Sequence, residues 1–179
     1  MTQSKADFIK VTNKKIEMYE MFQTAIMHIT SILPKYNGKK MNKRFLDAVN
    51  TLLTDNNVPI QFYFNKSYNG ERTRRFEMVY MNREFTLDYN TCVNTLYPGT
   101  NPEYLDEDFR LNAENFINVL GVELNRCKDC IEDYKAGLDK VDMVTSFYKD
   151  LEDYISTHMD KLPQCLQDKK YKYLNCPIY

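Results

Sequence analysis

Residues 59–81 read PIQFYFNKSYNGERTRRFEMVYM, and this stretch decides the fold class. Apolar and polar side chains alternate on both sides of Asn69-Gly70, which is the period of a strand that buries one face. Asn-Gly readily adopts the positive φ angles of a tight hairpin turn. The sequence therefore predicts an antiparallel hairpin over residues 59–81.

The hairpin is expected to gain a third strand and a helical cover. Residues 84–88 follow it after a short link and place Phe85 and Leu87 on one side, so they predict the third strand of a small meander. The alternation leaves this meander with one apolar face, which must be buried against helices. The inward residues of the hairpin are predicted to be Ile60, Phe62, Phe64, Phe76, Met78 and Tyr80.

Helices are predicted on both sides of the meander. Apolar residues recur every three or four positions over residues 4–33, until Pro34 ends the pattern, and again over residues 42–55. The same period runs through residues 112–162, where Gly137 is the expected position of a bend or of a turn into an α-hairpin. These patterns predict two long helices and a short one.

The composition agrees with a mainly helical α+β protein. The chain has 179 residues, 43% of them hydrophobic, and its five Gly and six Pro are few for a turn-rich β-sandwich. We expect a single domain over residues 1–179, in which the helices pack with a three-stranded antiparallel meander. Its predicted segments are 1–57 (helical), 58–89 (meander), 90–111 (acidic surface loop), 112–162 (long helix) and 163–179 (basic tail).

The sequence favours a cytoplasmic protein. The first residues carry charges throughout and lack the apolar region of a signal peptide, and no apolar stretch approaches the length of a membrane-spanning helix. Five Cys is an odd number in a chain that can build its own core, which favours reduced thiols over a disulfide framework.

No motif in the chain predicts catalysis, a cofactor or a metal site. Cys127 and Cys130 have the CxxC spacing of a zinc site, to which Cys165 and Cys176 could add two ligands. However, the first pair lies inside a strong helical repeat rather than on a turn, which favours plain thiols. His28 and His158 lie in no nucleophile motif. We therefore expect a protein that is not an enzyme.

Charge is separated along the chain although the net charge is only −1. Residues 1–101 carry a net charge of +5, residues 102–160 a net charge of −9 and residues 161–179 a net charge of +3. The acidic part predicts a partner-binding helical surface, whose residues are Glu123, Asp129, Glu132, Asp133, Asp139, Asp142, Asp150 and Asp153. The basic part predicts an alternative, nucleic-acid-binding surface, whose residues are Lys39, Lys40, Lys43, Arg44, Arg72, Arg74 and Arg75.

These surfaces lead to three hypotheses. In the first, the protein is a phage or mobile-element factor that inhibits a host nucleic-acid-handling or defence complex by occupying its basic surface; anti-CRISPR proteins are examples of this functional class. In the second, the basic hairpin binds nucleic acid directly. In the third, the long helices self-associate in a virion or an assembly. A fourth interpretation is neutral, because the basic and acidic parts could simply pair within the molecule.

Overall fold

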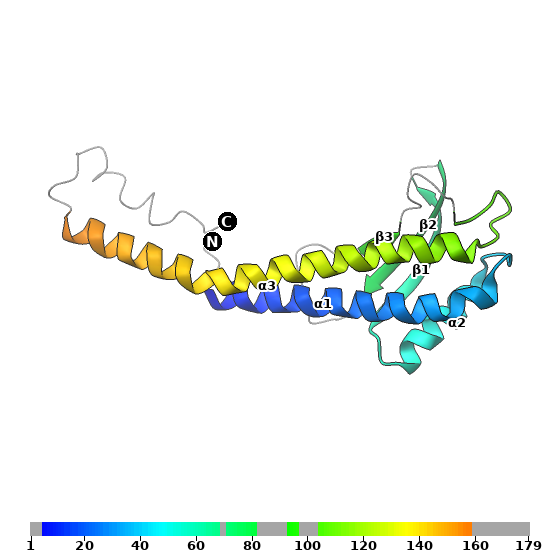
Figure 1. The fold of residues 1–179 in the computed structure, drawn as a ribbon, viewed down its shortest axis with the longest axis horizontal. Helices are drawn as coiled ribbons and strands as arrows, with labels where there is room; N and C mark the ends of the chain where they lie inside the picture. The colour runs from blue at the N-terminus through cyan, green and yellow to red at the C-terminus, as the bar shows by residue number, and fades with distance from the viewer. Residues whose placement is uncertain (1–4, 69–70, 82–92, 97–103, 159–179) are drawn as a thin grey trace. The chain divides into compact units, whose positions relative to one another are not determined.

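The computed structural model describes residues 5–68, 71–81, 93–96 and 104–158. Helices dominate the chain, and an antiparallel sheet packs beside them, so the predicted mainly helical α+β class is confirmed (Figure 1). The elements in chain order are α1 (Lys5–Ile32), the 3-10 helix η1 (Leu33–Tyr36), α2 (Lys43–Asp55), β1 (Ile60–Tyr68), β2 (Glu71–Tyr80), β3 (Val93–Leu96) and α3 (Ala113–Thr157).

The chain forms two compact units. Unit 1 consists of Met1–Asn13 and Glu132–Tyr179, and unit 2 consists of Lys14–Ile131. By their bounds, helices α1 and α3 each contribute to both units, whereas α2 and the sheet belong to unit 2. The single domain that the sequence predicts stays a prediction.

The three helices arise where the periodic patterns predict them. Helix α1 ends just before Pro34, whose ring stops an α-helix and starts the 3-10 turn of η1. Helix α2 begins after Asn42, whose side-chain oxygen accepts a hydrogen bond from the amide of Phe45 at 3.3 Å. This cap satisfies one of the first-turn amides that lack a partner inside the helix.

Helix α3 continues through Gly137, so the α-hairpin alternative at this position is wrong. A glycine in a helix costs only about 1 kcal/mol relative to alanine. Leu138 and Val141 continue the apolar series beyond it and are half-buried. The packing on both sides of the glycine therefore outweighs the local cost of keeping it helical.

The sheet has the order β1-β2-β3, and both pairings are antiparallel. The predicted hairpin is confirmed by the register Ile60 to Tyr80 and Phe62 to Met78, although its turn at 69–70 lies outside the described residues. The predicted third strand at 84–88 also lies outside them, so the meander is not confirmed as predicted. The strand that pairs with β2 is Val93–Leu96, in a segment whose irregular pattern predicts a loop.

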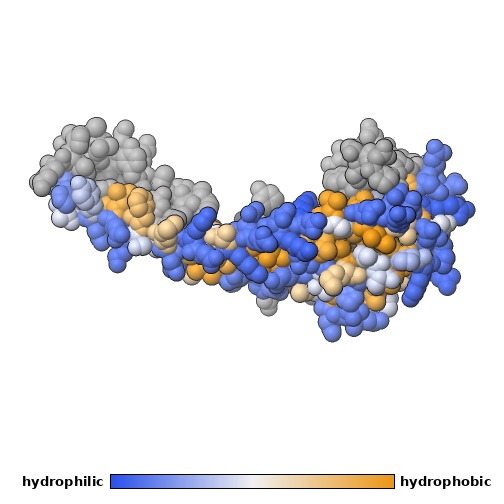
Figure 2. All heavy atoms as spheres, in the orientation of Figure 1, coloured by the Kyte–Doolittle hydropathy of each residue, from blue (hydrophilic) through white to orange (hydrophobic). Residues whose placement is uncertain are grey.

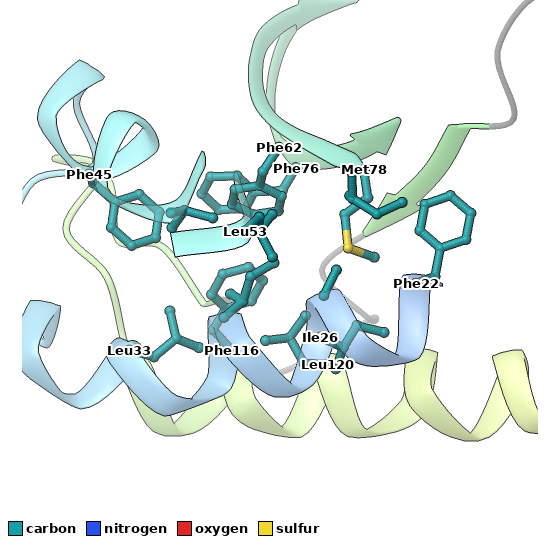
Figure 3. Packing of buried hydrophobic residues seen from close by; sticks show 14 of the residues in the cluster. Phe22, Ile26, Leu33, Phe45, Leu53, Phe62, Phe76, Met78, Phe116 and Leu120 are labelled. Carbon is teal, nitrogen blue, oxygen red and sulfur yellow. The ribbon is translucent and has the colours of Figure 1, made fainter. Parts of the chain in front are cut away.

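The core of unit 2 is an aromatic cluster between the sheet and the helices (Figure 3). Phe76 of β2 is at its centre, with its ring centroid 4.8 Å from that of Phe62 and 5.0 Å from that of Phe116 on α3. Phe45 of α2 closes one side. The apolar face that the alternation predicts is thus buried against α1, α2 and α3.

The prediction of a surface loop over residues 90–111 is wrong for part of this segment. Tyr104, Leu105 and Leu111 are almost completely buried, and the ring of Tyr104 stacks on Phe116 with 4.6 Å between the centroids. The acidic residues Asp106 to Asp108 of the same segment are exposed. Their charges dominate the local composition and hide the three apolar residues that enter the core.

Candidate functional site

The predicted acidic surface is divided between the two units. Glu123 and Asp129 belong to unit 2, and the other six predicted residues belong to unit 1. All except Glu123 are exposed. Among described residues, two of the eight form ion pairs: Glu123 lies 3.0 Å from the guanidinium of Arg126, and Asp142 pairs with Lys5. The exposed acidic residues of unit 1 are Glu132, Asp133, Asp139, Asp142, Asp150 and Asp153.

An exposed apolar stripe runs along the same part of α3. Its members follow at steps of four, four and three residues, so they share one helix face. Figure 2 shows hydrophobic surface interrupting the hydrophilic surface near the carboxyl end of this helix. The members of the apolar stripe are Met143 (66% exposed), Phe147 (63%), Leu151 (38%) and Tyr154 (59%).

Charged side chains border the apolar stripe. Asp139 precedes Met143 by four residues, and Asp150 lies between Phe147 and Tyr154 at helical spacing from both. Lys140 also adjoins the stripe, three residues before Met143. Residues 132–158 contain seven acidic residues and three lysines, which gives this segment a net charge of −4. The result is an apolar strip with Asp139 and Asp150 along one side, in an acidic part of the helix.

The apolar stripe is a feature that the sequence interpretation misses. The heptad pattern of residues 112–162 identifies the series that includes Cys127 and Ile131, both of which are buried. The exposed series begins at Met143, on another face of the helix. A search for a second period within the same helix could have found it.

The predicted basic residues fall into three groups. Lys39, Lys40, Lys43 and Arg44 are exposed and lie between the end of η1 and the first turn of α2. Arg72 and Arg74 are on β2, but their side chains lie outside the described part of the structure.

Arg75 is buried, unlike Lys39, Lys40, Lys43 and Arg44. Its side chain pairs with Glu77 on the same strand, with 3.4 Å between guanidinium Nε and carboxylate. Only 8% of the residue is exposed, so its charge is not offered at the surface.

A basic pocket of about 420 Å³ lies at the start of α2. The ammonium of Lys39 is placed over the ring of Tyr36, 5.4 Å from its centroid. Of the predicted basic residues, Lys39, Lys40 and Arg44 meet here, and Lys35 joins them. The residues that line this basic pocket are Lys35, Tyr36, Lys39, Lys40, Asn42, Arg44 and Phe45.

Among the described residues, the thiols and two further pockets offer little chemistry. Within the described residues no three His, Cys, Asp or Glu side chains gather as metal ligands, and Cys165 and Cys176 lie outside this part of the chain. Cys127 is buried; this burial, followed by the charge of Glu123, raises the pKa of its thiol from 9.0 to about 12. The described residues that line two further pockets, of about 650 and 420 Å³, include neither His nor Cys.

His28 and His158 do not meet a nucleophile in the described contacts. His28 is half-buried on α1, where its carbonyl accepts a hydrogen bond from the hydroxyl of Ser31. The ring of His158 stacks on that of Tyr154, with 4.4 Å between centroids, and its Nδ1 lies 3.0 Å from the carbonyl of Tyr154. This contact holds His158 against the last residue of the apolar stripe.

Within the described residues, no helix is both long and apolar enough to pass through a membrane.

Comparisons with known proteins find no relative of this chain. No protein-family model matches the chain, and no curated protein or solved structure is similar to it at a significant level.

Proposed function

We propose that the protein is a non-enzymatic interaction factor that binds a protein partner through the apolar stripe of α3 and the carboxylates beside it. One observation carries the proposal: Met143, Phe147, Leu151 and Tyr154 are exposed together on one helix face. Single exposed apolar residues are normal on a protein surface, whereas a contiguous group is typical of a binding site.

Binding would bury this group. Full burial of a Met, Leu or Phe side chain in an interface stabilises the complex by about 1.5 to 3 kcal/mol. A few such side chains can therefore supply much of the binding energy. Helices that dock in a groove use anchors at this spacing. Phe147 and Tyr154 are the aromatic type that most often dominates such interfaces.

The carboxylates define the chemistry of the partner. Asp139 and Asp150 border the stripe, and the net charge of −4 over residues 132–158 favours a basic partner surface. A second copy of this helix would bring like charges together, which disfavours self-association through this face. The partner is therefore an apolar surface with basic edges.

A host nucleic-acid-handling or defence complex would offer the basic part of such a surface. Proteins that bind nucleic acid present clustered Lys and Arg, and an acidic helix can occupy such a cluster. An inhibitor from a phage or mobile element that acts on such a complex is the specific form of this proposal. The charge separation along the chain and the acidic border of the stripe support it.

Affinity capture with wild-type protein and two variants tests the proposal. The stripe variant carries Met143→Ser, Phe147→Ser and Tyr154→Ser. Val122→Ser is the control, because Val122 is 68% exposed but lies outside the stripe. Mass spectrometry should identify a protein that wild type and control retain, that the stripe variant loses, and whose retention survives nuclease treatment. A partner that all three retain equally, or recovery of nucleic acid alone, contradicts the proposal.

Sedimentation over a range of concentrations separates this proposal from the structural alternative. A virion or assembly component should form larger species as its concentration rises, and the stripe variant should not. An interaction factor with a basic partner should stay at one size, because its own acidic borders repel. Stripe-dependent self-association would favour the assembly role over the one proposed here.

A further inference from the structure

We infer that the basic pocket at the start of α2 binds phosphate groups carried by a nucleic acid or by a free nucleotide. This site belongs to unit 2 and is independent of the apolar stripe, which belongs to unit 1. Its volume of about 420 Å³ lies within the range of small-molecule sites. The following features make phosphate the ligand that fits it.

Among the described residues, the charges that line the pocket are all positive. Lys35, Lys39, Lys40 and Arg44 contribute four cationic side chains, and none of the other described lining residues carries a carboxylate. None of the four forms an ion pair with a residue that the structure describes. Like charges held close together repel, and a multivalent anion in their midst removes this repulsion.

The first turn of α2 adds to the positive potential. Helix N-termini carry a partial positive charge, and acidic side chains usually offset it. Here the first turn holds no acidic residue, and Lys43 and Arg44 follow the cap Asn42 directly. An anion bound beside this turn would meet both the helix dipole and the cationic side chains.

The backbone that carries the lysines is held in place. The amides of Gly38 and Met41 donate to the carbonyls of Leu111 and Phe109, both at 2.8 Å. The amide of Leu111 donates in return to the carbonyl of Lys39 at 3.0 Å. These hydrogen bonds hold the backbone of the segment, so binding would mainly order side chains, which lowers its entropic cost.

Arg44 and Tyr36 could contact a phosphorylated ligand in ways that charge alone does not provide. A guanidinium can donate two parallel hydrogen bonds to a phosphate, which lysine cannot do. The half-buried ring of Tyr36 is held edge-on against Phe45, with 5.0 Å between centroids, and Lys39 lies over it. A nucleic acid or nucleotide offers a base that can stack on such a ring, in addition to its phosphates.

Fluorescence anisotropy with a labelled single-stranded DNA, together with calorimetric titration of ATP, tests the inference. The test variant carries Lys39→Gln and Arg44→Gln. The matched control carries Lys10→Gln and Lys128→Gln, two exposed lysines that remove the same charge but do not line the pocket. Circular dichroism confirms that both variants are folded.

Loss of two phosphate contacts should lower the slope of log affinity against log salt by about 1.4 for a single strand, and the control should keep the wild-type slope. Pocket-dependent binding of DNA assigns the site to nucleic acid. Pocket-dependent binding of ATP without DNA binding assigns it to free nucleotides. The inference is overturned if neither ligand binds at low salt, or if the control loses as much affinity as the test variant.

Discussion

The side chain of Asn50 binds the main chain of Phe62 at two points. Its Nδ2 donates to the carbonyl of Phe62 at 3.0 Å, and its Oδ1 accepts from the amide of Phe62 at 2.8 Å. Phe62 lies on β1, at the edge of the sheet order β1-β2-β3, where its outward main-chain groups have no neighbouring strand among the described residues. Asn50 thus replaces a strand partner and fixes α2 to the sheet.

Asn50→Ala should lower the free energy of unfolding by about 2 kcal/mol, because two hydrogen bonds are lost at about 1 kcal/mol each. Asn50→Asp should also destabilise, since a carboxylate can accept from the amide but cannot donate to the carbonyl. Urea denaturation measures both changes. Asn125→Ala, at an exposed position of α3, is the control and should stay near wild type. Equal stability of Asn50→Ala and wild type would show that the two-point contact contributes nothing.

Phe76→Ala should be the most damaging truncation in the sheet, with a loss of about 3 to 5 kcal/mol, because its ring lies at the centre of the aromatic cluster. Phe76→Leu should lower the free energy of unfolding by less than Phe76→Ala. It therefore supplies a variant that still folds, with which Phe76→Ala can be compared. Tyr63 on the neighbouring strand is 41% exposed, so Tyr63→Ala should change stability by no more than about 0.5 kcal/mol. Thermal denaturation compares the three variants, and similar losses for Phe76→Ala and Tyr63→Ala would contradict the assigned faces of the hairpin.

Two glycine substitutions should change the stability of the protein in opposite directions. Gly38 has a φ of +70°, so Gly38→Ala should destabilise by roughly 1 to 2 kcal/mol even though nothing lies within 4 Å of an added Cβ. Gly121 is exposed and helical with equal space, so Gly121→Ala should stabilise by up to about 1 kcal/mol. Chemical denaturation measures both. A stabilising effect of Gly38→Ala would contradict the positive φ described at Gly38, and a destabilising effect of Gly121→Ala would contradict the open helical position described for Gly121.

Stability should fall as pH rises from about 9 toward 12. Burial raises the pKa of Cys127 from 9.0 to about 12 and also raises that of Tyr104 above its ordinary value. In this range the unfolded chain loses protons that the folded chain retains, so alkali favours unfolding. Denaturation at a series of pH values should show that the free energy of unfolding falls less steeply with pH for Cys127→Ala than for wild type. An unchanged decline in this variant would mean that Cys127 does not contribute to it.

The same burial should protect Cys127 from alkylation. The thiolate is the reactive form, and both the raised pKa and the lack of solvent contact reduce its access to reagent. Mass spectrometry after a short treatment with iodoacetamide at pH 8 should find Cys127 modified more slowly than the half-buried Cys130. Denatured protein, in which the two sites should react alike, is the control. Faster modification of Cys127 in folded protein would contradict its position in the core.

The elements found from the sequence are those with an uninterrupted period. Helices α1 and α2 and the β1-β2 hairpin each bury one face regularly, so the spacing of apolar residues predicts them. Strand β3 has only four residues and takes its place from pairing with β2, which no local pattern reports. Tyr104 is similar: a single buried aromatic residue within an acidic segment has no period to detect it.

The candidate sites were predictable only in part. Charge counts identify the acidic end of the chain and the basic segment around Lys39. They do not show that Arg75 is buried beside Glu77, or that Lys35 joins Lys39, Lys40 and Arg44 around one pocket, because both depend on tertiary packing. Exposure of the apolar stripe depends on which face of α3 finds a partner in the fold, and a hydrophobic pattern cannot distinguish the two faces.

Site-specific photo-crosslinking from the apolar stripe tests the proposed function most directly. A photoreactive phenylalanine analogue replaces Phe147 in one protein and Val122 in another, both exposed positions on α3. The proposal predicts a crosslinked protein partner from position 147 only, and a weaker crosslink when Asp139→Asn and Asp150→Asn remove the acidic border. No protein crosslink at position 147, or equal crosslinking of the same protein from position 122, would contradict it.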